Sequence, residues 1–417
     1  MKGMFVIIDG VADESCKALG DKTPLEAAKT PNLDEISEKS KMDYCYPVKE
    51  GVAPQSSSAI VSLLGYDPVY VPRGPLEAMG AGISLTNGDL ALRTNFASVK
   101  GMENGEILDR RVGRTLTTKE AKILAKAINE NVFLPFKFEF YSTVQHRGVL
   151  VLRGGFSDNI TGTDPAYGSG VVRRRPIEKI TFSRPQDEED DSKLSADLVN
   201  TFIRKSFEVL DGHAINLYRR KKGLYPANLL LCRDAGNEPI KLNKIKGKWM
   251  ALGYMPLEIG IAKATGMDVY KFKYPKLKGI DAYDNLYSGL KRAIKYSIKM
   301  LRKYRKKYDY FYIHFKETDT PGHDNKPVDK VRMIELLDRE FFGFLKKFLR
   351  NERLVVTADH TTSCRVKGHT SHPVPVLIYG GPSQKKILRG QRFTEKEGYK
   401  GKKWLGRKLL DGTLFLV

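Results

Sequence analysis

Cysteine is scarce in this chain. Its 417 residues include four, which are Cys16, Cys45, Cys232 and Cys364. They form no Cys-x-x-Cys pair and no regular framework, so the sequence favours neither a disulfide-stapled secreted protein nor a zinc site built from cysteines. We therefore expect reduced thiols and a cytoplasmic protein.

Long hydrophobic runs are missing as well. The apolar stretch at residues 4–8 is shorter than the hydrophobic region of a signal peptide, and Asp9 follows it at once. No segment approaches the roughly 18 uninterrupted apolar residues that a membrane span needs. We expect a protein with no membrane anchor and no secretory leader.

Acidic residues are comparatively few. The chain has 49 aspartates and glutamates against 71 lysines and arginines, which gives a formal net charge of +22. Such a surface attracts anions, including phosphorylated metabolites, nucleic acids and acidic lipids. The basic residues are spread along the chain without a compact basic motif interleaved with aromatics, which argues against nucleic-acid binding. We expect a phosphorylated small molecule as the partner, and a solvated loop at the acidic run 187–191.

The chain does contain short apolar or β-branched runs that alternate with longer stretches of helical periodicity. This pattern is typical of an α/β protein whose mostly parallel sheet is flanked by helices. The predicted strands are residues 4–8, 148–152, 229–232, 310–315, 353–357 and 374–379. The clearest predicted helices are roughly residues 283–307 and 329–349, with a turn and a short helix at 29–37 and a loop or crossover at 171–195.

Three of the predicted strands run directly into acidic residues. Asp9 follows residues 4–8, Asp319 follows residues 310–315, and Asp359 with His360 follows residues 353–357. In open α/β sheets, ligands bind just beyond the carboxyl ends of the strands. We therefore expect these acidic residues to converge in one crevice.

Histidines are concentrated in the same part of the chain, since five of the seven lie between residues 314 and 372. Together with the carboxylates, His323, His360 and His369 make an oxygen and nitrogen donor set that suits Mn²⁺, Zn²⁺ or Mg²⁺-like ions. A pair of such ions ~3.5–4 Å apart neutralises carboxylates and clamps a phosphoryl group. Taken alone, Asp9 is best explained as a helix cap, and Asp319 with His323 as an incidental pair. Acidic residues and histidines that follow three separate strands favour a metal site instead.

A serine triplet, Ser56 to Ser58, precedes an apolar run that we expect to be helical. A serine at a helix start lies beside free backbone N–H groups and the positive end of the helix dipole, which suits a phosphoryl group. Such serines are more often helix caps, so the metal site is what makes a nucleophile plausible here.

These residues together resemble the archaeal type of cofactor-independent (2,3-bisphosphoglycerate-independent) phosphoglycerate mutase, in the alkaline phosphatase superfamily. The resemblance runs over nearly the whole chain. It is carried by the stretches VIIDGVAD, KTPLEAAKTPNLDEIS, GVAPQSSSAIVSLLGYDP, RGPLEAMGAGI, ILDRRVGR, RRKKGLYPANLLL, HFKETDTPGHD and TADHTTSCRVKGHTSHPVPVLI. It implies an alkaline-phosphatase-like domain with an inserted second α/β domain. We accordingly place the metal-binding domain at residues 1–85 and 246–417 and an inserted, substrate-clamping domain at 86–245.

The resemblance also implies an activity, the interconversion of 3-phosphoglycerate and 2-phosphoglycerate in glycolysis and gluconeogenesis through a phosphoserine. It implies two divalent ions, manganese first and Zn²⁺, Co²⁺ or Mg²⁺ as alternatives, and no 2,3-bisphosphoglycerate. One ion would be bound by Asp9, Asp359, His360 and Ser56, and the other by Asp319, His323 and His369. Ser56 would accept the phosphoryl group and Lys316 would steady it. Candidates for the anion clamp in the inserted domain are Arg110, Arg111, Arg114, His146, Arg147, Arg219 and Arg220.

The sequence departs from the family pattern beside the nucleophile. Relatives of this type usually read Gly-Ser-Asp with a histidine four residues after the serine, whereas this chain has Gln55, Ser57 and Ile60 at those positions. Ser57 and Ser58 thus remain alternatives to Ser56. The alternative functions are another metal-dependent phosphatase or phosphomutase of the superfamily and, less favoured, a basic nucleic-acid-binding protein.

Overall fold

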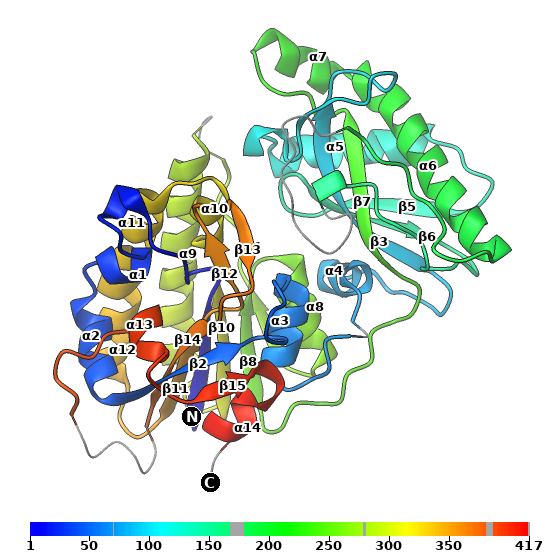
Figure 1. Cartoon of the computed structure of the whole chain (residues 1–417). Helices are drawn as coiled ribbons and strands as arrows, with labels where there is room; N and C mark the ends of the chain where they lie inside the picture. The colour runs from blue at the N-terminus through cyan, green and yellow to red at the C-terminus, as the bar shows by residue number, and fades with distance from the viewer. Residues whose placement is uncertain (70, 167–178, 278–280, 381–386, 416–417) are drawn as a thin grey trace.

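Two sheets organise the chain, one in each lobe of the computed structural model (Figure 1). The structure describes all residues except 70, 167–178, 278–280, 381–386 and 416–417. In the described part, eight strands form the larger sheet in the order β15-β2-β14-β11-β1-β10-β8-β9. Their bounds are β1 Gly3–Ile8, β2 Ser40–Tyr46, β8 Trp249–Gly253, β9 Asp268–Lys271, β10 Tyr310–Phe315, β11 Arg353–Thr357, β14 Val374–Tyr379 and β15 Lys403–Leu405.

The middle of this larger sheet is parallel. Strand β1 lies between β10 and β11 and runs parallel to both, with Ile7 opposite His314 on one side and Thr357 on the other. Strand β8 continues the parallel part beyond β10, whereas β14 is antiparallel to both β11 and β2. All six residues of β1 are buried, which is the expected consequence of covering both faces of a parallel strand. The predicted α/β fold with a mostly parallel sheet is confirmed.

Helices cover the two faces of the larger sheet (Figure 1). One layer contains α2 Pro31–Glu38, α9 Ala282–Tyr304, α11 Pro327–Leu337 and α12 Gly343–Phe348, and the other contains α3 Ser56–Leu63 and α8 Pro256–Ala264. Shorter helices complete this lobe, namely α1 Pro24–Ala27, α10 Asp319–His323, α13 Glu395–Gly398 and α14 Leu409–Thr413. The hairpin of β12 Thr361–Ser363 and β13 Gly368–Thr370 stands above the sheet's carboxyl edge.

The second lobe is built from an antiparallel sheet with helices against it. Its strands are β3 Leu90–Val99, β4 Ile107–Asp109, β5 Phe138–Ser142, β6 Arg147–Leu152 and β7 Leu229–Gly236, with β3 paired to β4, β6 and β7. Its helices are α5 Thr118–Asn131, α6 Asp190–Asp211 and α7 Ala214–Lys221. Its buried apolar residues fall between 90 and 232, whereas the core of the larger lobe draws on residues 4–76 and 245–414. We propose on this basis that residues 1–85 with 246–417, and 86–245, form separate domains.

Helix α4 (Arg73–Ala81) joins the lobes. It packs on β3 and β7 of the smaller sheet and on α8 of the larger lobe. Two glycines allow a very close approach to α8, since a Cβ on Gly260 would lie 1.9 Å from the Leu76 carbonyl oxygen, and a Cβ on Gly80 1.8 Å from that of Pro256. The start of α8 is thereby held against α4.

Two predicted segments differ from the structure. The predicted helix 329–349 consists of α11 and α12 with a π-helical turn, Asp338–Phe342, between them. There the Asp338 carboxylate accepts hydrogen bonds from the Leu33 N–H and the Asn32 amide, so the segment serves the start of α2. The loop predicted at 171–195 lies partly outside the described residues, and its last residues belong to α6, which begins at Asp190 within the acidic run.

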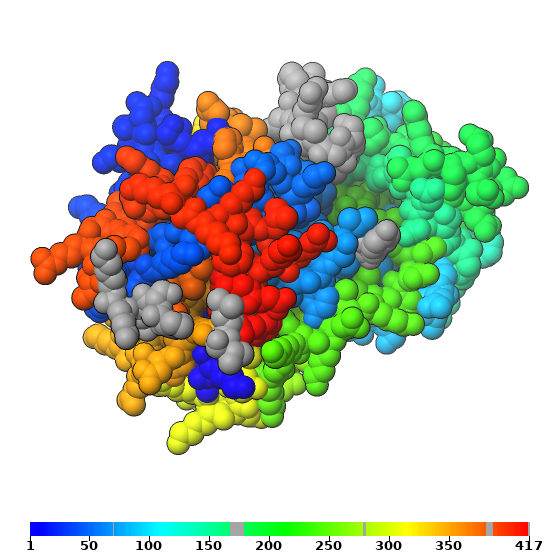
Figure 2. All heavy atoms as spheres, turned by 60° about the horizontal axis from the view of Figure 1, so that its bottom comes forward, coloured from blue at the N-terminus to red at the C-terminus, as the bar shows by residue number. Residues whose placement is uncertain are grey.

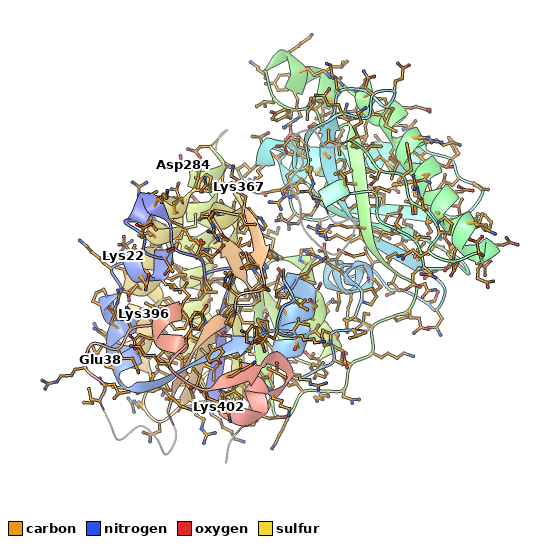
Figure 3. All side chains as sticks on the ribbon, viewed as in Figure 1. Lys22, Glu38, Asp284, Lys367, Lys396 and Lys402 are labelled. Atoms are coloured by element: carbon orange, nitrogen blue, oxygen red, sulfur yellow. The ribbon has the colours of Figure 1, made fainter. Side chains whose placement is uncertain are left out.

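The first strand and the last helix lie near each other in the larger lobe. Strand β1 begins and helix α14 ends on the same side of this lobe (Figure 1), where β15 pairs with β2 and the C-terminal segment lies over residues of the N-terminal third (Figure 2). The charged residues labelled in Figure 3, among them Lys22, Lys396 and Lys402, lie around the outer surface of this lobe. Within the described residues, the helices include none whose length and apolar character would suit a membrane span.

Candidate active site

Four adjacent parallel strands deliver charged side chains to one edge of the larger sheet. Along the order β11-β1-β10-β8, the residues beyond the strand ends are Asp359 with His360, then Asp9, then Lys316 to Asp319, then Glu258 in the first turn of α8. The Asp9 N–H donates to the Phe315 carbonyl at 2.8 Å, which continues the ladder between β1 and β10 to the site itself. The three strand ends predicted from the sequence are neighbours in the sheet.

Asp9 and Asp359 form the deeper cluster together with two histidines. His360 Nε2 lies 3.4 Å from Asp9 Oδ1 and 3.3 Å from Asp359 Oδ2, and His314 Nε2 lies 3.3 Å from Asp9 Oδ2. All four side chains are at most 2% exposed. Asp9 Oδ1, Asp359 Oδ2 and His314 Nε2 have no hydrogen-bond partner among the described residues, and Asp9 Oδ2 faces the Lys316 ammonium group. Buried polar atoms without hydrogen bonds are costly, and a divalent cation would satisfy these.

Asp319, His323 and His369 form a second cluster beside the first. His323 Nε2 lies 3.4 Å from Asp319 Oδ2, and His369 Nε2 lies 3.6 Å from Asp319 Oδ1. The His360 ring stacks on the His369 ring with centroids 3.6 Å apart, so the two clusters adjoin. Ligand atoms of Asp319, His360 and His369 lie within 4.8 Å of one another, as do those of Asp9, His314 and Asp359. Both donor sets fit a divalent ion of the Mn²⁺ or Zn²⁺ kind.

Hydrogen bonds to the outer ring nitrogens orient these histidines. His369 Nδ1 donates to the Pro54 carbonyl at 2.7 Å, and His323 Nδ1 to the Lys367 carbonyl at 3.2 Å. The Thr362 hydroxyl donates its proton to Asp319 Oδ1 at 2.8 Å. In its contact with His360 Nδ1, 2.9 Å away, the hydroxyl must therefore be the acceptor, and Nδ1 carries the proton. In each ring Nε2 is left as an acceptor that faces a carboxylate, which is the arrangement found around metal-binding histidines.

Burial keeps His323 and His360 neutral. Burial lowers the pKa of His323 to about 4, and burial together with His369 lowers the pKa of His360 well below its usual value. Burial, followed by the neighbouring charge of Asp9, raises the pKa of Asp359 to about 7. Burial acts to raise the pKa of Asp9, but Lys316, His314 and His360 together outweigh burial, so the pKa is lowered. Neutral imidazoles and crowded carboxylates are what a cation site requires.

Ser56 stands at the start of α3 and faces these clusters. Its Oγ lies 3.1 Å from His360 Nε2. Ser58 Oγ instead donates to the Gln55 carbonyl, and Ile60 is fully buried in the apolar core. Of the three serines, Ser56 is the one that lines the cleft.

Lys316 lies between two carboxylates on the other side of Asp9. Its ammonium group forms an ion pair with Asp9 Oδ2 and another, at 2.9 Å, with Glu258 Oε1. Burial alone would lower the pKa of Lys316, but Asp9 and then Glu258 raise it well above the usual range. The lysine is therefore a fixed positive charge at the wall of the cleft.

The cleft runs from these residues to the smaller lobe, where its wall is strongly basic. Four of the sequence-predicted clamp residues line it, Arg111, Arg114, His146 and Arg147. Burial, and next the charge of Arg111, lowers the pKa of Arg147 to about 10. The charges of Arg111 and Arg73 add to the effect of burial, and an anion bound beside these arginines would relieve their mutual repulsion. Arg114 reaches across and pairs with the Asp324 carboxylate beside His323.

The other three predicted clamp residues lie elsewhere. Arg110 forms a two-pronged ion pair with Asp164. Arg219 is 1% exposed and donates to Glu120, to Thr115 and to the Tyr225 carbonyl, and Arg220 pairs with Asp211 on the surface. None of the three is among the residues that line the cleft in the described part of the chain.

Several residues of this site were not predicted from the sequence. His314 lies within β10, where a polar residue in a fully buried apolar strand was the available signal. Glu258 follows a short strand, β8, that the sequence did not indicate. Further residues of the cleft wall are Arg73, Glu77, Arg93, Asn95, Arg233 and Glu317.

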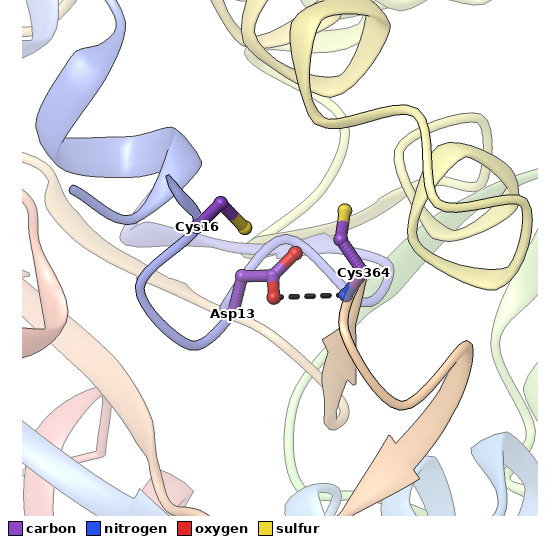
Figure 4. A group of neighbouring side chains, drawn as sticks. All are labelled: Asp13, Cys16 and Cys364. Atoms are coloured by element: carbon purple, nitrogen blue, oxygen red, sulfur yellow. Dashed lines mark hydrogen bonds between the residues drawn. The ribbon is translucent and has the colours of Figure 1, made fainter. Parts of the chain in front are cut away.

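Asp13, Cys16 and Cys364 form a third cluster (Figure 4). The Cys364 N–H donates to Asp13 Oδ1 at 3.0 Å. The fully buried Lys330 ammonium donates to Asp13 Oδ2 at 2.8 Å and to the carbonyls of Ala12 and Thr362. Because this ammonium supplies the positive charge, we interpret the cluster as a brace between the segment after β1 and the β12–β13 hairpin, which carries His369.

Known proteins match this chain over nearly its whole length. A family model described as 2,3-bisphosphoglycerate-independent phosphoglycerate mutase matches residues 38–216. Enzymes of that name from Thermococcus kodakarensis and Pyrococcus furiosus are 40% and 39% identical, over 91% and 96% of this chain and 88% and 93% of their own.

Solved structures agree. A Pyrococcus horikoshii protein aligns over 99% of this chain and 96% of its own with TM-score 0.72 and 29% identity. The cofactor-independent phosphoglycerate mutase of Thermoplasma acidophilum aligns over 100% of both chains, with TM-score 0.55 and 27% identity. The chain belongs to the 2,3-bisphosphoglycerate-independent phosphoglycerate mutase family.

Proposed function

We propose that this protein interconverts 3-phosphoglycerate and 2-phosphoglycerate, with Ser56 as the temporary phosphoryl carrier. The proposal rests above all on one observation, the meeting of Ser56 with Asp9, Asp359 and His360 at the floor of a cleft whose opposite wall is basic. Relatives of that name support the substrate. We place the reaction in the cytoplasm, in glycolysis and gluconeogenesis.

Two divalent cations are the proposed cofactors. Asp9, Asp359 and His360 would hold one beside Ser56, with His314 close to it, and Asp319, His323 and His369 would hold the other. Mn²⁺ is the proposed ion because mixed carboxylate and imidazole donors suit it. When bound, the cations would polarise the phosphoryl oxygens and lower the pKa of the serine hydroxyl.

The residues of this chain would then divide the work. Ser56 Oγ forms a bond to phosphorus, the bond from phosphorus to O3 of the glycerate breaks, and the serine proton ends on O3. The glycerate stays in the cleft and turns. Its O2 then forms a bond to phosphorus, the bond from Ser56 Oγ to phosphorus breaks, and the O2 proton ends on Ser56 Oγ. Lys316 steadies the phosphoryl oxygens, and Arg111, Arg114, His146 and Arg147 retain the carboxylate and the phosphate.

Water must be kept out while the serine is phosphorylated, because hydrolysis would release phosphate in place of 2-phosphoglycerate. Residues of the smaller lobe line the cleft opposite Ser56, and the Arg114–Asp324 ion pair joins the two lobes across it. The alternative activity, that of a phosphatase, differs from the mutase only in this exclusion of water.

The test follows both products from 3-phosphoglycerate and Mn²⁺ by ³¹P NMR. We expect 2-phosphoglycerate in large excess over inorganic phosphate, and phosphate located on Ser56 by mass spectrometry of acid-quenched enzyme. Ser56→Ala should lose more than 99.9% of the activity, whereas Ser58→Ala, whose hydroxyl only caps a backbone carbonyl, should keep most of it. Stoichiometric release of inorganic phosphate, or phosphate on Ser57 or Ser58, would contradict the proposal.

A further inference from the structure

Glu258 is a buried carboxylate of the cleft with no assigned task. It lies in the first turn of α8, is 3% exposed, and lines the same cleft as Ser56 and Lys316. Its carboxylate forms an ion pair with Lys316 at 2.9 Å. Apart from this ion pair, the two carboxylate oxygens have no hydrogen-bond partner among the described residues. Burying a carboxylate that has one ion-pair partner costs free energy, because a single ion pair does not fully repay the loss of hydration. We therefore expect the pair to have a function.

Lys316 is shared between two carboxylates that differ in their other duties. Asp9 is a proposed metal ligand, whereas Glu258 lies on the far side of the lysine ammonium group. Three carboxylates gather here, those of Asp9, Asp359 and Glu258. Burial and then the charges of these three carboxylates raise the pKa of the Tyr312 hydroxyl well above its usual value. One lysine and one divalent cation together carry three positive charges. The three negative charges of Asp9, Asp359 and Glu258 balance them, whereas Asp9 and Asp359 alone would not.

Asp9 attracts Lys316 less strongly when the metal site is filled than when it is empty. With its carboxylate shared with a divalent cation, Asp9 offers less negative charge to Lys316, and the cation itself repels the ammonium. Glu258 is then the remaining carboxylate within reach of Lys316. We propose that Glu258 is a positioning residue that keeps the Lys316 ammonium in the cleft, beside the phosphoryl group, once the metal site at Asp9 is filled. This inference rests on the proposed function for the identity of the phosphoryl group.

The packing of α8 is suited to this task. Glu258 lies two residues before Gly260, which packs so closely on the α4 backbone that a Cβ there would meet the Leu76 carbonyl oxygen at 1.9 Å. Pro256, which begins α8, is equally close to Gly80 of α4. The carboxylate therefore stands on a helix end that is pinned from two sides, as accurate positioning demands.

The experiment compares Glu258→Gln and Glu258→Asp with the wild type and with Glu395→Gln. Glu395 is a buried glutamate outside the cleft that accepts hydrogen bonds from the Asp13 N–H and the Thr23 hydroxyl. We expect Glu258→Gln to lower kcat about 30-fold with KM within threefold, Glu258→Asp to recover part of the loss, and Glu395→Gln to stay near the wild type. In a Lys316→Ala background, Glu258→Gln should cost nothing further, because its effect passes through the lysine.

Two readouts need no catalysis. Calorimetric Mn²⁺ affinity should change less than threefold in Glu258→Gln, whereas a ligand role would lower it at least tenfold. In Mn²⁺-loaded protein, acetylation of Lys316 by acetic anhydride, followed by peptide mass spectrometry, should be at least tenfold faster in Glu258→Gln than in the wild type.

The inference is overturned by unchanged Lys316 acetylation, by a tenfold loss of Mn²⁺ affinity, or by an undiminished effect of Glu258→Gln without Lys316. A wild type that fails to convert 3-phosphoglycerate refutes the proposed function instead. In that case the acetylation and calorimetry still decide the fate of Glu258.

Discussion

The close packing of α4 on α8 can be tested with a single methyl group. In Gly260→Ala the new Cβ would lie 1.9 Å from the Leu76 carbonyl oxygen and 2.8 Å from its carbon. Cβ atoms essentially never come within 3.0 Å of another heavy atom, so the helices must separate by at least the difference between 3.0 and 1.9 Å, which is 1.1 Å. Both atoms belong to backbone, so a change of side-chain rotamer cannot relieve the clash.

We expect Gly260→Ala to destabilise the protein by about 3 kcal/mol, at the upper end of ordinary overpacking, and to lower Tm by roughly 5 °C. Activity should fall as well, since α8 carries Glu258 and α4 carries Arg73 and Glu77 of the cleft wall. Scanning fluorimetry and the mutase assay measure the two effects.

Gly212→Ala is the matched control, because a Cβ there meets nothing within 4 Å and its φ of −85° suits alanine. Gly212→Ala should leave Tm and activity close to those of the wild type. If Gly260→Ala behaves in the same way as this control, the close packing of the helices, and the positioning of Glu258 derived from it, are refuted.

Two further predictions concern charge. Arg147→Ala should raise KM for 3-phosphoglycerate about 10- to 100-fold through the loss of a charge-assisted hydrogen bond, whereas Arg220→Ala, on the surface beside Asp211, should leave KM within twofold; equal effects would contradict the placement of the anion clamp. Burial raises the pKa of Glu395 from 4.5 to about 7, so its contribution to stability is complete below about pH 4.5 and is lost as the pH rises through 7. The unfolding free energy of the wild type relative to Glu395→Gln should therefore fall by about 3 kcal/mol across that interval, measured by urea titration, and a constant difference would show that Glu395 is ionised throughout.

The part of the site that could be predicted from sequence is the part carried by strand ends. Asp9, Asp319 and Asp359 follow short β-forming runs, and parallel strands place their carboxyl ends at one edge whatever their separation along the chain. To predict the metal site, it was then enough to expect that the histidines between residues 314 and 372 lie near the same edge. The β12–β13 hairpin brings His369 there, against His360.

Residues whose position depends on packing between distant segments could not be predicted in this way. Arg219 belongs to a run of basic residues that resembles an anion clamp, but Glu120 and Thr115, about one hundred residues earlier, turn it into an internal brace. Glu258 reaches the cleft because α8 packs on α4 through Gly80 and Gly260, an arrangement with no signature in local sequence.

The helix predicted at 329–349 shows the same limit on a smaller scale. Its apolar periodicity is real, but Asp338 turns toward the start of α2 and the backbone widens into a π-helical turn at that point. Apolar periodicity indicates which face of a helix is buried. It does not indicate a hydrogen-bond partner from another segment, such as the start of α2, that accompanies a local π-helical turn.

The most direct test of the central claim is the anomalous scattering of manganese in crystals of this protein grown with Mn²⁺. We predict two peaks ~3.5–4 Å apart, one bounded by Asp9, Asp359 and His360 and the other by Asp319, His323 and His369. Absence of both peaks at saturating Mn²⁺, or a peak only at the Asp13, Cys16 and Cys364 cluster, would contradict it.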